Sequence, residues 1–346
     1  MAASDPARPP VPEPVEALRE MAYWLERALS DGFRVRAYRR AADALAQLTD
    51  EELDLLDERD AWTSVPGLGE KIAAFVREAR QGRVPEPLAR LRDAGSTPLA
   101  DDAGLRAALR GDLHVHTVWS DGTVSLREMV GTAEQLGHEY IAVTDHSPRL
   151  RVAHGLSPER VRAQWGEIEE VQGGTPVRIL RGGEIDILET GALDQSAEVL
   201  DGMDVVVASI HSDLRADRET MTRRMVAGIA NPHTTVLGHC TGRLVRGDRG
   251  VRPESAFDAE VVFEACRTFG VAVEINSRPE RLDPPMRLLR LAADMGCLFS
   301  IDTDAHAPGQ LDFLSYGCER AAAAGIAAER IITTWPLDDL LAFAAT

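Results

Sequence analysis

The spacing of hydrophobic positions divides the chain near residue 110. Before that point, apolar side chains recur every three or four positions, as in Leu18, Met21 and Leu25. This is the period of amphipathic helices, and glycines and acidic residues interrupt it where helices would end. The pattern predicts a small all-helical domain over residues 15–95.

From residue 111 onward, short apolar runs of strand length alternate with longer stretches of helical spacing. Strands that alternate with helices form parallel sheets covered by those helices, so the pattern predicts a barrel-like α/β domain over residues 111–346. The seven predicted strands are residues 112–116, 140–144, 178–180, 204–210, 235–237, 271–275 and 298–301.

Two further segments complete the expected organisation. Residues 1–14 are rich in proline and alanine and lack apolar periodicity, which is typical of a flexible tail. Residues 96–110 form a linker between the two domains. A chain of 346 residues is long enough for one large hydrophobic core and one small one.

Side chains that bind metals occur at the ends of most predicted strands. His114 and His116 are two positions apart in the first strand, so both point to the same side and can hold one ion together. A single histidine at a strand end is more often a structural residue, but the repetition at strand after strand favours a shared site, at the end where barrel enzymes place their chemistry. The candidate ligands are His114, His116, Asp121, His146, Glu184, His211, His239, Asp304 and His306.

The mixture of imidazoles and carboxylates indicates which ions would bind. It suits zinc, manganese or iron, whereas magnesium alone prefers oxygen ligands. The ligands are too many for one ion, so we expect two or three divalent ions, with Glu184 as the best bridging carboxylate.

Such ions activate water and neutralise charge on a phosphate. The candidate site therefore predicts a hydrolase that attacks phosphate esters with a metal-bound hydroxide. We place Glu184, Asp304 and His306 in the catalytic centre. Arg243 is expected to clamp the substrate phosphate, together with Arg278 and Arg281, because a guanidinium group forms paired hydrogen bonds with phosphate.

Charge, cysteines and hydropathy limit the classes of function. A formal net charge of −18 argues against a protein that coats nucleic acid, because such proteins neutralise phosphates with many basic side chains. The four cysteines fit no CxxC pattern, so we expect them to be reduced and buried. No apolar run is long enough for a membrane span and the N-terminus lacks an apolar signal core, so we expect a cytoplasmic protein without membrane contacts.

An ordered set of motifs, HVHTVWSDG, AVTDHS, GGEIDI, ASIHS, LGHCTGR, VEINSRPERLDPP and DTDAHAP, resembles the PHP (polymerase and histidinol phosphatase) domain. The resemblance covers about residues 110–343 and is closest to the PHP domain appended to bacterial family X DNA polymerases. It implies a distorted seven-stranded β/α barrel that holds up to three metal ions on the nine candidate ligands. Some family X polymerases have Gln at the position of His114, so the intact histidine favours a competent site.

The helical domain also carries a recognisable motif. VPGLGEKIA, together with the preceding FRVRAYRRAADAL, resembles the helix-hairpin-helix domain at the N-terminus of family X polymerases. Backbone N–H groups at such a helix start can face a phosphate. The resemblance implies binding to nicked or gapped DNA, with contacts from Arg36, Arg39, Arg40, Gly67, Gly69 and Lys71.

Two activities of family X polymerases are not expected here. In DNA polymerase beta, which this domain resembles, a lysine removes a deoxyribose phosphate. Aligning the motifs places that lysine at Phe75 of this chain, so no lyase activity is predicted. The short linker leaves no room between the two domains for the fingers, palm and thumb, so no nucleotidyl transfer is predicted.

Three functions remain open. The first is a phosphoesterase acting on DNA, as a 3'-5' exonuclease, a 3'-phosphatase or an abasic-site endonuclease in DNA repair. The second is a small-molecule phosphatase of the histidinol phosphate type. The third is a non-catalytic DNA-binding protein with structural metals, and the helical domain has the further alternative of being a vestigial cap or a dimerisation module.

Overall fold

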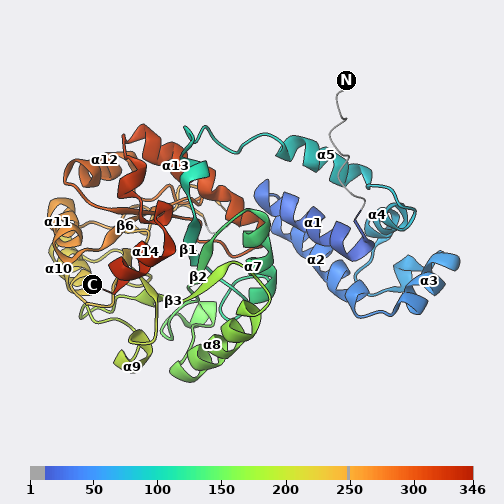
Figure 1. The fold of residues 1–346 in the computed structure, drawn as a ribbon, viewed down its shortest axis with the longest axis horizontal. Helices are drawn as coiled ribbons and strands as arrows, with labels where there is room; N and C mark the ends of the chain where they lie inside the picture. The colour runs from blue at the N-terminus through green and yellow to red at the C-terminus, as the bar shows by residue number, and fades with distance from the viewer. Residues whose placement is uncertain (1–11, 248–249, 346) are drawn as a thin grey trace. The chain divides into compact units, whose positions relative to one another are not determined.

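The computed structural model describes residues 12–247 and 250–345, which fold into two compact units (Figure 1). The first unit extends to Pro98 and contains only helices. The second unit runs from Leu99 to Thr346 and contains all the strands that the structure describes.

The helical unit packs around one apolar core. Trp62 and Leu88 are fully buried in it, together with the regularly spaced apolar residues of the first helix. Most of the predicted tail lies outside the described residues, and Pro14 begins the first helix. The helices are α1 (Pro14–Arg27), α2 (Gly32–Ala46), α3 (Asp50–Glu58), α4 (Glu70–Arg80) and α5 (Glu86–Gly95), with a short 3-10 turn, η1 (Trp62–Ser64), before α4.

The starts of these helices follow from local side-chain chemistry. Thr49 and Glu52 form a reciprocal capping box at α3, in which the side chain of each residue accepts a hydrogen bond from the backbone N–H of the other. The Asp31 side chain accepts a bond of 2.7 Å from the N–H of Phe33 at the start of α2. Prolines occupy the first turns of α1 and α5, where no N–H is needed.

The second unit is built on a seven-stranded parallel sheet whose strands lie in sequence order. The sheet closes through a parallel bridge between Val115 and Ala305, where the N–H of His116 donates to the Ala305 carbonyl at 2.8 Å. The predicted α/β barrel is therefore confirmed. Its strands are β1 (Gly111–Val115), β2 (Tyr140–Val143), β3 (Arg178–Asp186), β4 (Val205–Ser209), β5 (Val236–Leu237), β6 (Ala272–Asn276) and β7 (Phe299–Asp302).

Helices alternate with the strands and surround the barrel (Figure 1). The predicted linker is shorter than expected, because Leu105 and Leu109 pack against the core of the second unit. The helices are α6 (Leu105–Ala108), α7 (Leu126–Gln135), α8 (Pro158–Gln172), α9 (Ala197–Leu200), α10 (Arg218–Ile229), α11 (Ala259–Phe269), α12 (Met286–Asp294), α13 (Leu314–Ala323) and α14 (Leu337–Ala344).

The third strand is longer than its sequence pattern predicts. Gly182 and Gly183 lie inside β3 and do not end it. A Cβ at Gly182 would stand 2.9 Å from Thr144 Cγ2 and 3.0 Å from the Val143 carbonyl oxygen, so the glycine permits a close approach to β2. Glu184 consequently projects from within a strand and not from a loop.

The four cysteines are free and buried, as predicted. Within the described parts of the chain, no helix combines the length and the apolar character that crossing a bilayer requires.

Candidate metal centre

The nine predicted ligands gather at the carboxyl ends of the barrel strands. Glu184 stands at the middle of the group, with its side chain 1% exposed. Five imidazole nitrogens approach its two carboxylate oxygens. They are His114 Nε2 at 3.4 Å, His116 Nε2 at 3.5 Å and His146 Nδ1 at 2.8 Å from Oε2, and His211 Nε2 at 3.2 Å and His239 Nε2 at 2.8 Å from Oε1.

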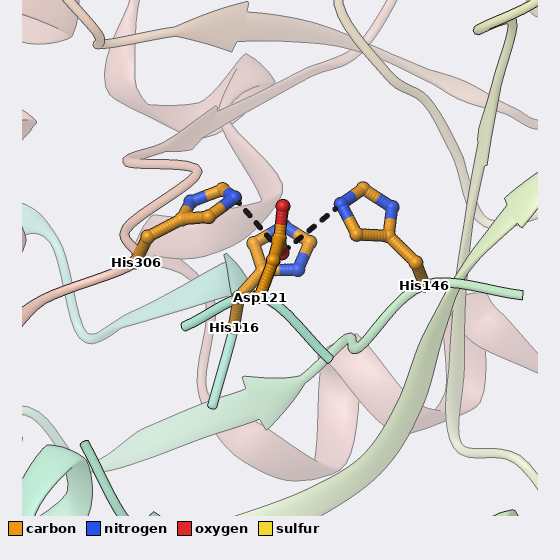
Figure 2. A group of neighbouring side chains, drawn as sticks. All are labelled: His116, Asp121, His146 and His306. Carbon is orange, nitrogen blue, oxygen red and sulfur yellow. Dashed lines mark ion pairs between the residues drawn. The ribbon is translucent and has the colours of Figure 1, made fainter. Parts of the chain in front are cut away.

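A second group forms around Asp121 (Figure 2). Its Oδ1 lies 3.4 Å from Nε2 of His146 and 3.3 Å from Nε2 of His306. The ring of His116 completes the group, with its centroid 4.2 Å from that of His306. The Nε2 atom of His116 also lies 3.4 Å from Oδ1 of Asp304, which brings the ninth ligand to the same place.

These side chains fit divalent cations, because several of their buried polar atoms have no hydrogen-bond partner among the described residues. The unpartnered atoms include Nε2 of His114, both ring nitrogens of His116, Nε2 of His211 and Oε2 of Glu184. Such atoms are costly to bury unless something binds them. Three sets have ligand atoms within 4.8 Å of one another: His116, Asp121, His146 and His306; His114, His116 and Glu184; and His146, Glu184 and His211.

Because the three sets share members, they form one candidate multinuclear centre and not separate sites. The electrostatics keep its carboxylates ionised. Burial raises the pKa of Glu184, but the neighbouring His211, His146 and His114 outweigh it and hold that pKa well below its usual value. Burial likewise raises the pKa of Asp304, and Arg281 is the largest influence that brings it well below the usual range.

Two carboxylates that the sequence analysis did not assign orient the imidazoles. Oε1 of Glu274 lies 2.6 Å from Nδ1 of His114, and Oδ1 of Asp186 lies 2.7 Å from Nδ1 of His211. Each contact leaves the Nε2 atom of the ring to face Glu184, as in many metal sites where a carboxylate fixes a ligating histidine. A sequence signal existed, because Asp186 is two positions after Glu184 and so points to the same side of β3.

Asp304 is held in an unusual backbone conformation. Its φ of 54° lies in the left-handed region, which costs a non-glycine residue about 1 kcal/mol. Arg281 Nε donates to its Oδ2 at 2.9 Å, and Arg278 Nη1 donates to its carbonyl oxygen at 3.1 Å. The Nη1 atom of Arg281 is buried and has no hydrogen-bond partner within the described chain.

Arg243 has several hydrogen-bond acceptors within the protein. Its Nε donates to the carbonyl of Arg281 at 3.0 Å, its Nη2 to the carbonyl of Leu282, and its Nη1 to Glu254 at 3.3 Å. The guanidinium therefore supports the loop that carries Arg281, and its contact with a substrate phosphate stays a prediction.

The helical unit presents five of the six predicted DNA contacts at its surface. Arg36, Arg40 and Lys71 are exposed, and Gly67 has a φ of 90° that only glycine adopts easily, just before Gly69 caps α4. The sixth residue, Arg39, is buried.

Arg39 is buried and forms a two-point ion pair with Glu26, with distances of 2.7 and 2.9 Å. The prediction that Arg39 contacts DNA is therefore wrong, because its guanidinium is directed into the helical core. The exposed face of α2 instead carries Phe33, which is 77% exposed and whose ring lies 4.6 Å from the Arg36 guanidinium.

Replacing Arg39 by Ala is expected to destabilise the helical unit by about 3–5 kcal/mol, because it leaves the buried Glu26 carboxylate without its ionic partner. Denaturant unfolding followed by far-UV circular dichroism measures the change. Arg40→Ala, on the exposed side of the same helix, serves as the control and should change the stability by less than about 0.5 kcal/mol. Equal effects of the two changes would contradict the assignment.

Comparison with known protein families agrees with this architecture. Residues 112–278 match the PHP domain family, and residues 9–83 match a helix-hairpin-helix domain family. Both resemblances predicted from the motifs are thereby confirmed.

Individual relatives extend the match. The chain is 37% identical over 236 residues to the DNA polymerase/3'-5' exonuclease PolX of Bacillus subtilis, covering 68% of this chain and 41% of the relative. It therefore spans less than half of that protein. A probable phosphatase of Escherichia coli, YcdX, is 30% identical over 207 residues, covering 57% of this chain and 78% of the relative.

Among solved structures, the histidinol phosphate phosphatase of Lactococcus lactis, complexed with zinc, L-histidinol and phosphate, overlaps with a TM-score of 0.46 at 18% identity, covering 63% of this chain and 94% of that one. With the matched domain, the barrel and the Escherichia coli relative taken together, the chain belongs to the PHP-domain family of metal-dependent phosphoesterases, and a helix-hairpin-helix domain precedes its barrel.

Proposed function

We propose that this protein hydrolyses phosphate esters at DNA ends or abasic sites, without polymerase activity, using two or three zinc, manganese or iron ions held by its nine ligands. The observation that carries the DNA assignment is the pairing, in one chain, of a phosphoesterase barrel with a helix-hairpin-helix unit that exposes Phe33, Arg36, Arg40 and Lys71. The similarity to a relative named as a polymerase and 3'-5' exonuclease supports the same substrate.

The bound ions would supply water activation and neutralise negative charge at the phosphate. The protein's own side chains would hold and orient the substrate. Arg281, with its unpartnered Nη1, would donate to a phosphate oxygen, and Arg278 beside it would add positive charge. Glu184 and Asp304 would hold the ions through their carboxylates, and the Arg281 guanidinium favours the ionised form of Asp304.

The helical unit would contribute affinity for the sugar-phosphate backbone. Lys71 lies in the first turn of α4, where the helix dipole and exposed N–H groups favour an anion. Arg36 and Arg40 would reach further phosphates from α2, and the exposed ring of Phe33 would stack on an unpaired base. Phe75 occupies the position at which a lyase lysine would be expected. Its ring is buried and packs edge-on against Tyr38, with the ring centroids 5.5 Å apart, and this apolar setting supports the prediction that the protein lacks lyase activity.

A small-molecule phosphatase is the second candidate, because several relatives are named probable phosphatases and the net charge of −18 disfavours extended DNA contacts. The two candidates are distinguished with the full chain, loaded with manganese or zinc, on gapped DNA, abasic DNA, 3'-phosphate ends and histidinol phosphate. We expect hydrolysis of one or more of the DNA substrates. Rapid turnover of histidinol phosphate without action on DNA would favour the second candidate, and inertness toward all four with ions bound would favour structural metals.

Replacing Lys71 by Ala is expected to weaken binding to gapped DNA several-fold and to lower the slope of log affinity against log salt by about 1, because one phosphate contact is lost. Fluorescence anisotropy at several salt concentrations measures both quantities. Arg90→Ala provides a matched loss of charge, since Arg90 on α5 is 79% exposed and pairs with Glu86. The proposed face would be abandoned if the Arg90 variant lost as much affinity as the Lys71 variant.

A further inference from the structure

Three threonines stand beside metal ligands in the sequence: Thr117 follows His116, Thr303 precedes Asp304, and Thr241 comes two residues after His239. Each contacts a buried aspartate from another strand or loop. We infer that these three threonine-aspartate pairs, defined here as clamps, are positioning devices that set the geometry of the metal ligands next to them.

The first clamp joins the loop after β1 to the end of β2. The Thr117 N–H donates to Oδ1 of Asp145 at 2.9 Å, and its hydroxyl donates to Oδ2 at 2.6 Å. The same hydroxyl accepts from the N–H of Trp119 at 3.2 Å, which tightens the turn that leads to Asp121.

The second clamp repeats this geometry between β7 and β1. The Thr303 N–H donates to Oδ1 of Asp112 at 3.2 Å, and its hydroxyl donates to Oδ2 at 2.5 Å. The N–H two residues later, that of Ala305, donates to the Thr303 hydroxyl at 3.1 Å.

The third clamp lies between the loops that follow β5 and β6. Thr241 donates from its N–H to Oδ1 of Asp283 at 3.2 Å and from its hydroxyl to Oδ2 at 2.7 Å. Its hydroxyl accepts from the N–H of Arg243 at 3.4 Å. Each of the three threonines thus forms the same three hydrogen bonds, through equivalent atoms.

All six clamp residues are buried, so their polar groups depend on one another for hydrogen bonds. Two bonds from one threonine to one carboxylate fix both the distance and the direction between neighbouring loops. A loop that slides must break both bonds at once, at a cost that water cannot offset in the buried interior. The clamps therefore hold the ligands in place before an ion arrives.

The first clamp should matter most. Asp145 also accepts from the N–H and hydroxyl of Ser120, at 3.2 and 2.5 Å, and from Gln164 at 2.5 Å, so it organises the whole turn before Asp121. Asp121 is the most exposed of the nine ligands, with 32% of its side chain exposed. Its position depends on the turn that Asp145 holds, in addition to its contacts with His146 and His306.

This inference rests on the proposed metal centre, and the decisive experiment measures metal binding and not activity. Thr117→Val removes the hydroxyl with little change of shape, and Asp145 keeps its other donors. We expect one ion of the bound set to be held about 10–100-fold more weakly, which is typical of losing a residue that supports a ligand. Equilibrium dialysis against metal buffers, followed by elemental mass spectrometry, gives the number and affinity of the ions.

Two variants make the result specific. Thr117→Ser keeps the hydroxyl and should restore binding to nearly the wild-type affinity. Thr235→Val is the matched control, because the buried Thr235 hydroxyl accepts from the N–H of Val206 at 3.2 Å at the opposite end of the barrel, and it should leave metal binding unchanged.

The outcomes separate the clamp from the centre itself. A wild-type protein that binds no ion would overturn the proposed metal centre. A wild-type protein that binds ions, with a Thr117→Val variant that binds them equally well or a Thr235→Val variant that loses as much, would overturn the clamp. If Thr117→Val does not fold, Thr303→Val applies the same measurement to the clamp beside Asp304.

Discussion

Replacing Glu184 by Gln is expected to lower kcat/KM for phosphate ester hydrolysis by about 10³-fold or more, because several kcal/mol of metal-dependent stabilisation of the transition state would be lost. Glutamine has the shape of glutamate but lacks the charge, and its amide nitrogen cannot bind a cation. Five imidazole nitrogens lie within 3.5 Å of the two carboxylate oxygens, which is the position expected of a carboxylate shared between ions.

The experiment compares steady-state rates with metal content. Glu184→Gln should lose at least one bound ion as well as activity, which distinguishes it from a substitution that only disturbs substrate binding. Glu189→Gln is the control, since Glu189 is 66% exposed and lies 3.7 Å from Arg149 at the surface, and it should leave both quantities unchanged. A Glu184→Gln enzyme with full metal content and the wild-type rate would contradict the bridging role.

The ligand set was accessible from the sequence because two regularities combine at the strand ends. Side chains two apart in a strand share a face, which joins His114 to His116, and parallel strands bring their carboxyl ends to one rim. The rim then gathers residues that are distant in the chain, such as Asp121 and His306, whose Oδ1 and Nε2 atoms lie 3.3 Å apart.

The supporting residues were harder to predict, because their role depends on what their side chains reach. Glu274 lies in β6 and acts on His114, which is 160 positions away in the chain. Nothing in the local pattern distinguishes it from a structural buried acid. Asp145 immediately precedes a ligand, yet it serves the loop after another strand.

The orientation of an arginine side chain was also hard to predict. Arg39 and Arg243 both lie inside motifs that resemble functional regions, and a motif does not say toward which side each arginine points. Arg39 turns toward Glu26 on the preceding helix, and Arg243 turns toward the loop of Arg281. Only the tertiary arrangement decides whether a guanidinium faces a ligand or satisfies the protein's own acceptors.

Strand boundaries show a similar limit. All seven strands were predicted, because strands buried on both faces are short continuous apolar runs. Gly182 and Gly183 appeared to end the third, since glycine often marks a turn. In the structure Gly182 allows β3 to approach β2 closely, and the strand continues to Asp186.

Removing the metal ions with a chelator is expected to abolish hydrolysis and to lower the melting temperature of the barrel unit by about 5–10 °C. Ions that bind the folded state at about 100 times their dissociation constant stabilise it by about 2.7 kcal/mol, and in a domain of this size each kcal/mol corresponds to about 2–4 °C. Without them, the buried ring nitrogens of His116 and Oε2 of Glu184 have no hydrogen-bond partner among the described residues.

Thermal unfolding of the chelated and reloaded protein, with metal content measured at each stage, tests this expectation. Zinc, manganese or iron should restore both stability and activity, whereas magnesium and calcium should restore little, because most of the ligands are imidazoles. Glu184→Gln offers an internal comparison, and chelation should shift its melting temperature less than that of the wild type. Undiminished hydrolysis by protein shown to be free of metal would rule out the metal-dependent chemistry proposed for this centre.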